Sequence, residues 1–172
     1  MQDFLKYPTL GKEISIIKTQ IVRKAETLYG EAYLTTPKDA AKMARHFYHG
    51  ADREIFLVCS VDASYSPVAF EVIAIGNLNS CIATPREIFK HAILNNAYAI
   101  LMFHNHPSGR CVPSNRDKLL TQRIYDAGKL LGICLADHII VGRQEEDYFS
   151  FANENCLTEG KRLEEDMIWQ QT

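Results

Sequence analysis

The segment HNHPSGRCVPSNRD, residues 104–117, decides the fold class of this chain. It follows the run AYAILMF at 97–103, which is too short and too apolar for anything other than a buried strand. It leads into a helix that Ser114 caps and that extends to Leu131, with Gly132 as its stop. A buried strand, a polar loop and a capped helix in succession predict an α/β protein whose functional groups lie beyond the strand end.

Two histidines and an aspartate in this segment have the spacing of metal ligands. His104 and His106 stand two residues apart in extended backbone, where side chains project to the same side. Asp117 lies one turn into the next helix and can turn back as an oxygen ligand. Three such ligands leave a fourth position for water, which is typical of a catalytic zinc, and zinc lowers the pKa of that water to about 7. Helix capping alone accounts for Ser114 or for Asp117, so the metal site rests on the combination.

The apolar pattern extends this unit in both directions. We expect strands at 13–22, 54–62, 68–76 and 133–142, and helices at 36–49 and 84–96 that open with threonine and proline. The turn at 63–67 makes two of the strands a hairpin. Hairpin and crossover connections together predict an α/β fold, a mixed β-sheet flanked by helices.

The composition is that of an ordinary globular protein. Of the 172 residues, 47% are hydrophobic and 23% charged, and the net charge of -2 argues against a broad phosphate-binding face. No segment resembles a signal peptide or reaches the roughly 18 apolar residues of a membrane helix, so we expect a cytoplasmic protein without a membrane partner. The five cysteines include no CxxC pair and are expected to be reduced.

The spacing also resembles a known motif. His-x-His, seven residues, Ser, two residues and Asp is the pattern of the JAMM motif in the JAB/MPN zinc metalloprotease superfamily. The sequence is similar to the RadC-like branch in HNHPSG, PSNRD and AGKLLGICLADHIIVG, and in REIF at 53–56, IGNLNS at 75–80 and PREIFKHAILNNA at 85–97. The resemblance spans roughly residues 35–152 and implies a cytidine-deaminase-like JAB/MPN core.

The resemblance implies a role for each matching residue. His104, His106 and Asp117 match the zinc ligands of the family. Ser114 matches the serine that donates a hydrogen bond to the oxyanion of the tetrahedral intermediate. Zn²⁺ is therefore the expected cofactor.

Two choices stay open at the sequence level. Glu54 best matches the catalytic glutamate that moves a proton from water to the leaving amine, and Glu71 in the second hairpin strand is its rival. We expect Asp137 and His138 either to hydrogen-bond a zinc ligand on the side away from the metal or to make a purely structural hydrogen bond. The remaining histidines have no further ligands near them in sequence and are assigned surface or core roles: His46, His49 and His91.

The residues and the resemblance together predict a zinc-dependent hydrolase, a metallopeptidase or isopeptidase acting on a peptide or protein. The alternative is a non-catalytic or vestigial metal-binding accessory in DNA repair or mobile-element transactions. Long RadC-like proteins carry an N-terminal helix-hairpin-helix region associated with DNA, which this chain does not show, so nucleic-acid binding and oligomeric state stay open. The expected organisation is a lead-in at 1–34 with one strand, a JAB/MPN domain at 35–152 and a charged tail at 153–172.

Overall fold

The computed structural model describes residues 34–76 and 83–157. The strand expected at 13–22 and most of the charged tail expected at 153–172 lie outside these residues. Within them, the elements follow in the order α1 (Pro37–Arg45), the 3-10 helix η1 (His46–Tyr48), β1 (Ile55–Val61), β2 (Pro67–Ile75), α2 (Pro85–Leu94), β3 (Ala99–Asn105), α3 (Asn115–Leu131), β4 (Cys134–Val141) and β5 (Tyr148–Ser150).

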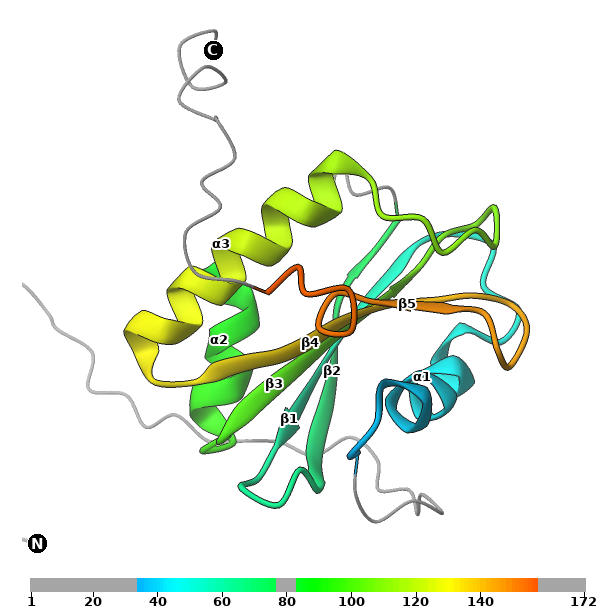
Figure 1. Ribbon diagram of the computed structural model, residues 1–172. Helices are drawn as coiled ribbons and strands as arrows, with labels where there is room; N and C mark the ends of the chain where they lie inside the picture. Colours follow the sequence, from blue (N-terminus) through cyan, green and yellow to red (C-terminus); the bar gives the residue numbers. More distant parts are fainter. Residues whose placement is uncertain (1–33, 77–82, 158–172) are drawn as a thin grey trace, which may run out of the picture.

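The strands form one mixed sheet in the order β2-β1-β3-β4-β5 (Figure 1). β1 pairs antiparallel with both β2 and β3, and β5 pairs antiparallel with β4. β3 and β4 are parallel, because α3 connects them as a crossover. The structure therefore confirms the predicted α/β fold with a mixed β-sheet flanked by helices.

Helices cover both faces of this sheet, with α1 on one side and α2 and α3 on the other (Figure 1). The alternation along β1 produces this arrangement, since Leu57 and Cys59 pack into the core beneath α1, whereas Phe56 and Val58 pack into the core beneath α2 and α3. Every residue of β3 is buried, as its continuous apolar run predicts. β3 is thus a rigid central strand that aims whatever follows it.

The helix after β3 begins at the predicted cap. The Ser114 side chain accepts from the backbone N–H of Asp117, and the Asp117 side chain accepts from the backbone N–H of Ser114, which completes a capping box. Gly132 ends α3 with a φ of 70°, a left-handed conformation that favours glycine. These local rules fix the start of α3 close to the end of β3.

The structure differs from the sequence expectations mainly at the boundaries of the elements. The helix expected at 36–49 ends at Arg45 and continues as η1, and β1 begins one residue after Glu54. β3 extends to Asn105, so His104 belongs to the strand rather than to the loop. β5 was not among the predicted strands, because three residues are too few to show an alternating pattern. In the described part of the chain, no helix is long and apolar enough to span a membrane.

Candidate metal centre

Four side chains converge where β3 ends and α3 begins. His104 is the penultimate residue of β3, His106 follows the strand, and Asp117 is the third residue of α3. β1 runs antiparallel to β3 with Phe56 opposite His104, which brings Glu54 to the same edge of the sheet. One ligating atom from each of Glu54, His104, His106 and Asp117 lies within 4.8 Å of all the others. Sheet register and helix capping together therefore assemble a possible metal-binding cluster.

The interatomic distances show that the ligating atoms of three side chains surround one common point. The two Nε2 atoms of His104 and His106 are 3.1 Å apart, and they lie 3.4 and 3.6 Å from the Asp117 carboxylate oxygens Oδ1 and Oδ2, respectively. Asp117 is 1% exposed, and its Oδ1 has no hydrogen-bond partner within the described ranges. A buried carboxylate oxygen that lacks a donor is costly unless a cation satisfies it.

Hydrogen bonding on the far side of the His106 ring favours the same conclusion. Nδ1 of His106 lies 2.7 Å from the Arg110 carbonyl oxygen, which can only accept, so Nδ1 carries a proton. The Nε2 atom of a neutral His106 then presents a lone pair toward His104. Two imidazole nitrogens and a carboxylate facing one point suit a divalent cation, so the residues present fit a metal.

Burial and neighbouring charges shift the pKa values of the three predicted ligands. Burial lowers the pKa of His104 to about 4, so that this ring is neutral at physiological pH. A hydrogen bond to Asp117 raises the pKa of His106 in the metal-free protein, against the opposing effect of burial. Burial by itself would raise the pKa of Asp117, but His106, His104 and Ser114 together hold it below its usual range. A neutral His104 and an ionised Asp117 are the protonation states in which both side chains can bind a cation.

The sequence model of the RadC-like JAB domain matches residues 34–156, which include the whole cluster. The chain belongs to this family. Among its relatives is a UPF0758 protein of Haemophilus influenzae (strain PittEE), 44% identical over 106 residues that make up 62% of this chain and 47% of the relative. A Clostridium tetani UPF0758 protein is 44% identical over 114 residues, 66% of this chain and 50% of the relative. A UPF0758 protein of Methanosarcina barkeri is 36% identical over 140 residues, which make up 80% of this chain and 60% of the relative. The chain therefore spans about half the length of the first two relatives, and the UPF0758 designation states no activity.

The RadC-like JAB domain holds Glu54 by its backbone on both sides. The Asn105 side chain accepts from the backbone N–H of Ile55 at 2.8 Å and donates to the carbonyl of Arg53 at 3.1 Å. The backbone N–H of Gly76 donates to the carbonyl of Glu54 itself at 2.8 Å. This role of Asn105 was not predicted, although its position between the two histidines, where an extended backbone turns its side chain the other way, was a usable signal.

The structure brings Glu54 into the cluster and leaves the rival carboxylate out of it. Glu71 lies in β2, paired with Val58 of β1, and it is not among the four residues that converge. This placement favours Glu54 as the proton carrier, while its catalytic role stays a prediction.

Ser114 contacts the cluster through a predicted ligand. Its hydroxyl donates to Oδ2 of Asp117 at 2.7 Å and accepts from the backbone N–H of Asp117 at 3.2 Å. The residue as a whole is exposed at the start of α3. The structure gives Ser114 a capping and ligand-holding role, and its contact with an oxyanion stays a prediction.

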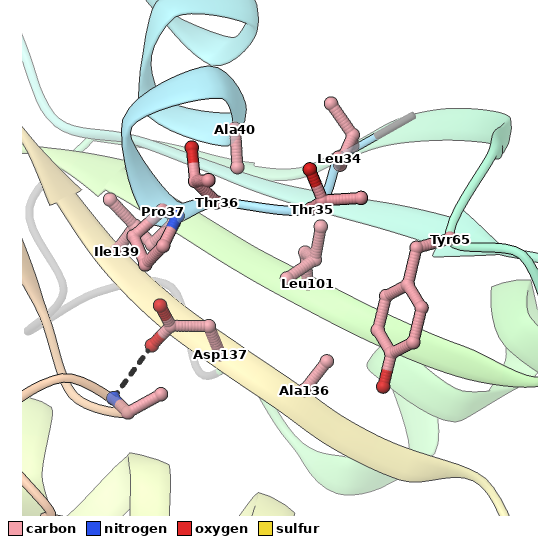
Figure 2. Close-up of a pocket in the computed structure, with 11 residues that line it drawn as sticks. Leu34, Thr35, Thr36, Pro37, Ala40, Tyr65, Leu101, Ala136, Asp137 and Ile139 are labelled. Carbon is pink, nitrogen blue, oxygen red and sulfur yellow. Dashed lines mark hydrogen bonds between the residues drawn. The ribbon is translucent and has the colours of Figure 1, made fainter. Parts of the chain in front are cut away.

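Asp137 and His138 point to opposite faces of β4. His138 is fully buried on the cluster side, where its Nε2 lies 2.9 Å from Nδ1 of His104. Asp137 instead lines a pocket beneath α1 on the other face, where it accepts from the backbone N–H of Ala152 at 2.9 Å (Figure 2). It also accepts from the Ser150 hydroxyl. Burial raises the pKa of Asp137. The structure therefore brings His138 to the cluster and does not bring Asp137 there.

Proposed function

We propose that this RadC-like JAB domain is a zinc-dependent hydrolase, a metallopeptidase or isopeptidase that cleaves an amide bond of a peptide or protein. The observation that carries the proposal is the convergence of Glu54, His104, His106 and Asp117 within 4.8 Å. Metal-dependent hydrolases occur among JAB domains, which agrees with this arrangement.

Two neutral imidazoles and one carboxylate are the ligand types that zinc accepts in catalytic sites. When bound, zinc would act as a Lewis acid that polarises the scissile carbonyl and lets a water ionise near neutral pH. His104, His106 and Asp117 would hold the ion, and their number leaves room for that water and for the substrate oxygen.

Glu54 would move the proton. Its carboxylate takes a proton from the attacking water and delivers it to the amide nitrogen, so that the carbon–nitrogen bond breaks with a neutral amine leaving. The hydrogen bonds between Asn105 and the backbone on either side of Glu54 restrain the backbone from which this carboxylate projects. Such restraint matters because proton transfer depends on heavy-atom separations of about 3 Å.

Ser114 would support the negative charge that develops on the substrate. The hydroxyl of this exposed residue, which donates to Asp117, can turn its proton toward the oxygen of the attacked carbonyl. A single donor of this kind contributes about 10²–10³ to the rate in other hydrolases. The capping bond to the backbone N–H of Asp117 needs only the oxygen of Ser114 and is kept.

Metal analysis is the first test. The chain, purified without chelator, should contain about one zinc per molecule. The Asp117→Ala variant should lose the metal while keeping its secondary structure. A wild-type protein that carries no transition metal, even after incubation with Zn²⁺, would overturn the proposal.

Hydrolysis is the second test. The protein is incubated with a mixture of peptides from a digested proteome and with peptides joined through a lysine side chain, and new amino groups are identified by mass spectrometry. Cleavage should vanish on dialysis against a chelator and return on addition of Zn²⁺. Chelator-insensitive cleavage would contradict the proposal, and a fully loaded protein without cleavage would favour the non-catalytic accessory role.

A further inference from the structure

A chain of hydrogen bonds links two predicted ligands behind the cluster. His104 Nδ1 lies 2.9 Å from His138 Nε2, and His138 Nδ1 lies 2.6 Å from the Thr121 hydroxyl. That hydroxyl in turn lies 2.6 Å from the carbonyl oxygen of Asp117. All four residues are at most 1% exposed, so solvent does not compete for these bonds. The chain joins His104 of β3 to Asp117 of α3 by way of β4.

The acceptor at the end of this chain fixes its direction. A carbonyl oxygen only accepts, so the single hydroxyl proton of Thr121 lies on the bond to Asp117. The Thr121 oxygen then accepts from Nδ1–H of His138. A neutral His138 with its proton on Nδ1 accepts at Nε2, and its donor is Nδ1–H of His104.

The opposite direction is unfavourable at both ends. If Thr121 donated to His138, its oxygen and the Asp117 carbonyl oxygen would lie 2.6 Å apart with no proton between them. His138 would then donate to Nδ1 of His104, and the proton of a neutral His104 would sit on Nε2. That proton would block the atom that faces His106 and Asp117.

We propose that Thr121 is a positioning residue: its hydroxyl sets the direction of the hydrogen-bond chain, which keeps the proton of His104 on Nδ1 and leaves Nε2 bare for a metal. The inference rests on the metal site of the proposed function and deepens it. Thr121 touches neither metal nor substrate, and it acts through His138.

An ordinary structural explanation covers only part of the geometry. Threonine in a helix often donates to the carbonyl four residues earlier, and Thr121 stands four residues after Asp117. This preference accounts for the bond from the Thr121 hydroxyl to the Asp117 carbonyl. It does not explain why His138, from a different element, lies 2.6 Å from the same hydroxyl, nor why the histidine continues to His104. The separation of four residues also keeps Thr121 on the helix face that carries Asp117.

The first test needs no variant. The ¹⁵N chemical shifts of the His104 ring in metal-free wild-type protein at pH 8 report which nitrogen carries the proton. We expect the Nδ1–H form to dominate. A ring protonated mainly on Nε2 would overturn the proposal.

The second test uses three variants and a competing chelator that reports Zn²⁺ affinity. Thr121→Val keeps the side-chain shape, removes the hydroxyl and should weaken zinc binding about 10–100-fold, the usual cost of losing such a supporting bond. Thr121→Ser restores the hydroxyl and should recover most of that affinity. Ser60→Ala is the matched control, because it removes a buried hydroxyl that lies 3.1 Å from His91, outside the chain, and should leave affinity unchanged.

The results separate this inference from the proposed function. Wild-type affinity in Thr121→Val, or equal losses in Thr121→Val and Ser60→Ala, would contradict the positioning role. If the valine variant does not fold, the ring tautomer of His104 in the wild type still decides. Failure of the wild type to bind any metal would overturn the proposed function, whereas the tautomer of His104 would still test the direction of the chain.

Discussion

Two groups of buried histidines lie on the same face of the sheet and differ in what surrounds them. At one end, His104 and His138 are fully buried and connect to the cluster. At the other, His91 of α2 is 6% exposed and lies 3.1 Å from the hydroxyl of Ser60 in β1. Burial lowers the pKa of all three rings. Burial and a depressed pKa therefore do not separate a candidate metal site from a structural histidine.

The two regions differ in what surrounds the Nε2 atom of the histidine ring. Nε2 of His91 is buried with no hydrogen-bond partner in the described residues, and no set of ligating groups gathers around it there. Nε2 of His104 meets a second imidazole and a carboxylate. In the candidate site, the lone pairs of the ring nitrogens converge on one point, while the ring protons lie on the opposite nitrogens.

The largest expected difference between the two regions is in metal content. His106→Ala removes the most exposed of the predicted ligands, with a side chain that is 18% exposed, so the fold should survive while the metal is lost. His91→Ala should keep about one zinc per chain. Elemental analysis of both purified proteins, with circular dichroism as the folding control, decides the matter. Equal metal loss in both variants would erase the distinction.

The second-largest difference is expected in the rate of hydrolysis, when either of two carboxylates is replaced: Glu54 in the cluster or Glu71 near His91. Glu54→Gln should reduce hydrolysis by about 10²–10⁴-fold with zinc still bound, because the amide cannot accept the proton of water. Glu71 lies near enough to His91 to raise its pKa slightly against the effect of burial, and Glu71→Gln should leave the rate unchanged. Turnover per bound zinc is the measurement. A slow Glu71→Gln with a normal Glu54→Gln would exchange their roles.

A smaller difference is expected between the caps of the helices that carry the two regions. Ser114→Ala and Thr84→Ala each remove a side-chain acceptor at a helix start, for α3 and α2, and each should lower the free energy of unfolding by about 1 kcal/mol. Only Ser114→Ala should also slow hydrolysis, by about 10²-fold, if its hydroxyl meets the oxyanion. Urea unfolding and turnover are measured on both. Equal rates at full zinc loading would restrict Ser114 to capping.

Local rules predicted much of the candidate site. The two-residue spacing of extended backbone placed His104 and His106 on one side, and the third position of a capping box placed Asp117 on the first turn of α3. Both features lie within one short segment. The fold class followed from the same segment together with the hairpin and the crossover connections, as the sheet order confirms.

Long-range register supplied what those rules could not. Residue spacing alone does not connect Glu54 with a histidine about 50 positions later, and the pairing of β1 with β3 does so. The approach of His138 to His104 likewise depends on the parallel pairing of β3 with β4, including its irregularity between Ile100 and Leu101. Thr121 could have been noticed as the next residue on the Asp117 face of α3, but nothing in the sequence named its partner.

The smallest expected effect concerns pH and tests the structural histidine alone. Burial lowers the pKa of His91 in the folded protein, whereas the unfolded chain has the ordinary value of about 6.5. Between these two values the unfolded state binds more protons, so lowering the pH through about 6.5 destabilises the fold, and the contribution of His91 is fully present only above that value.

The free energy of unfolding of the metal-free protein should therefore decline from pH 7 to pH 5. His91→Gln should reduce that slope by at most about 1.4 kcal/mol per pH unit, the value for one proton, without changing zinc affinity at pH 7.5. Urea unfolding at pH 5, 6 and 7 measures the slope for both proteins. An unchanged slope would show that His91 takes up its proton in the folded state as readily as in the unfolded one, and the two histidine regions would then differ in protonation as well as in ligands.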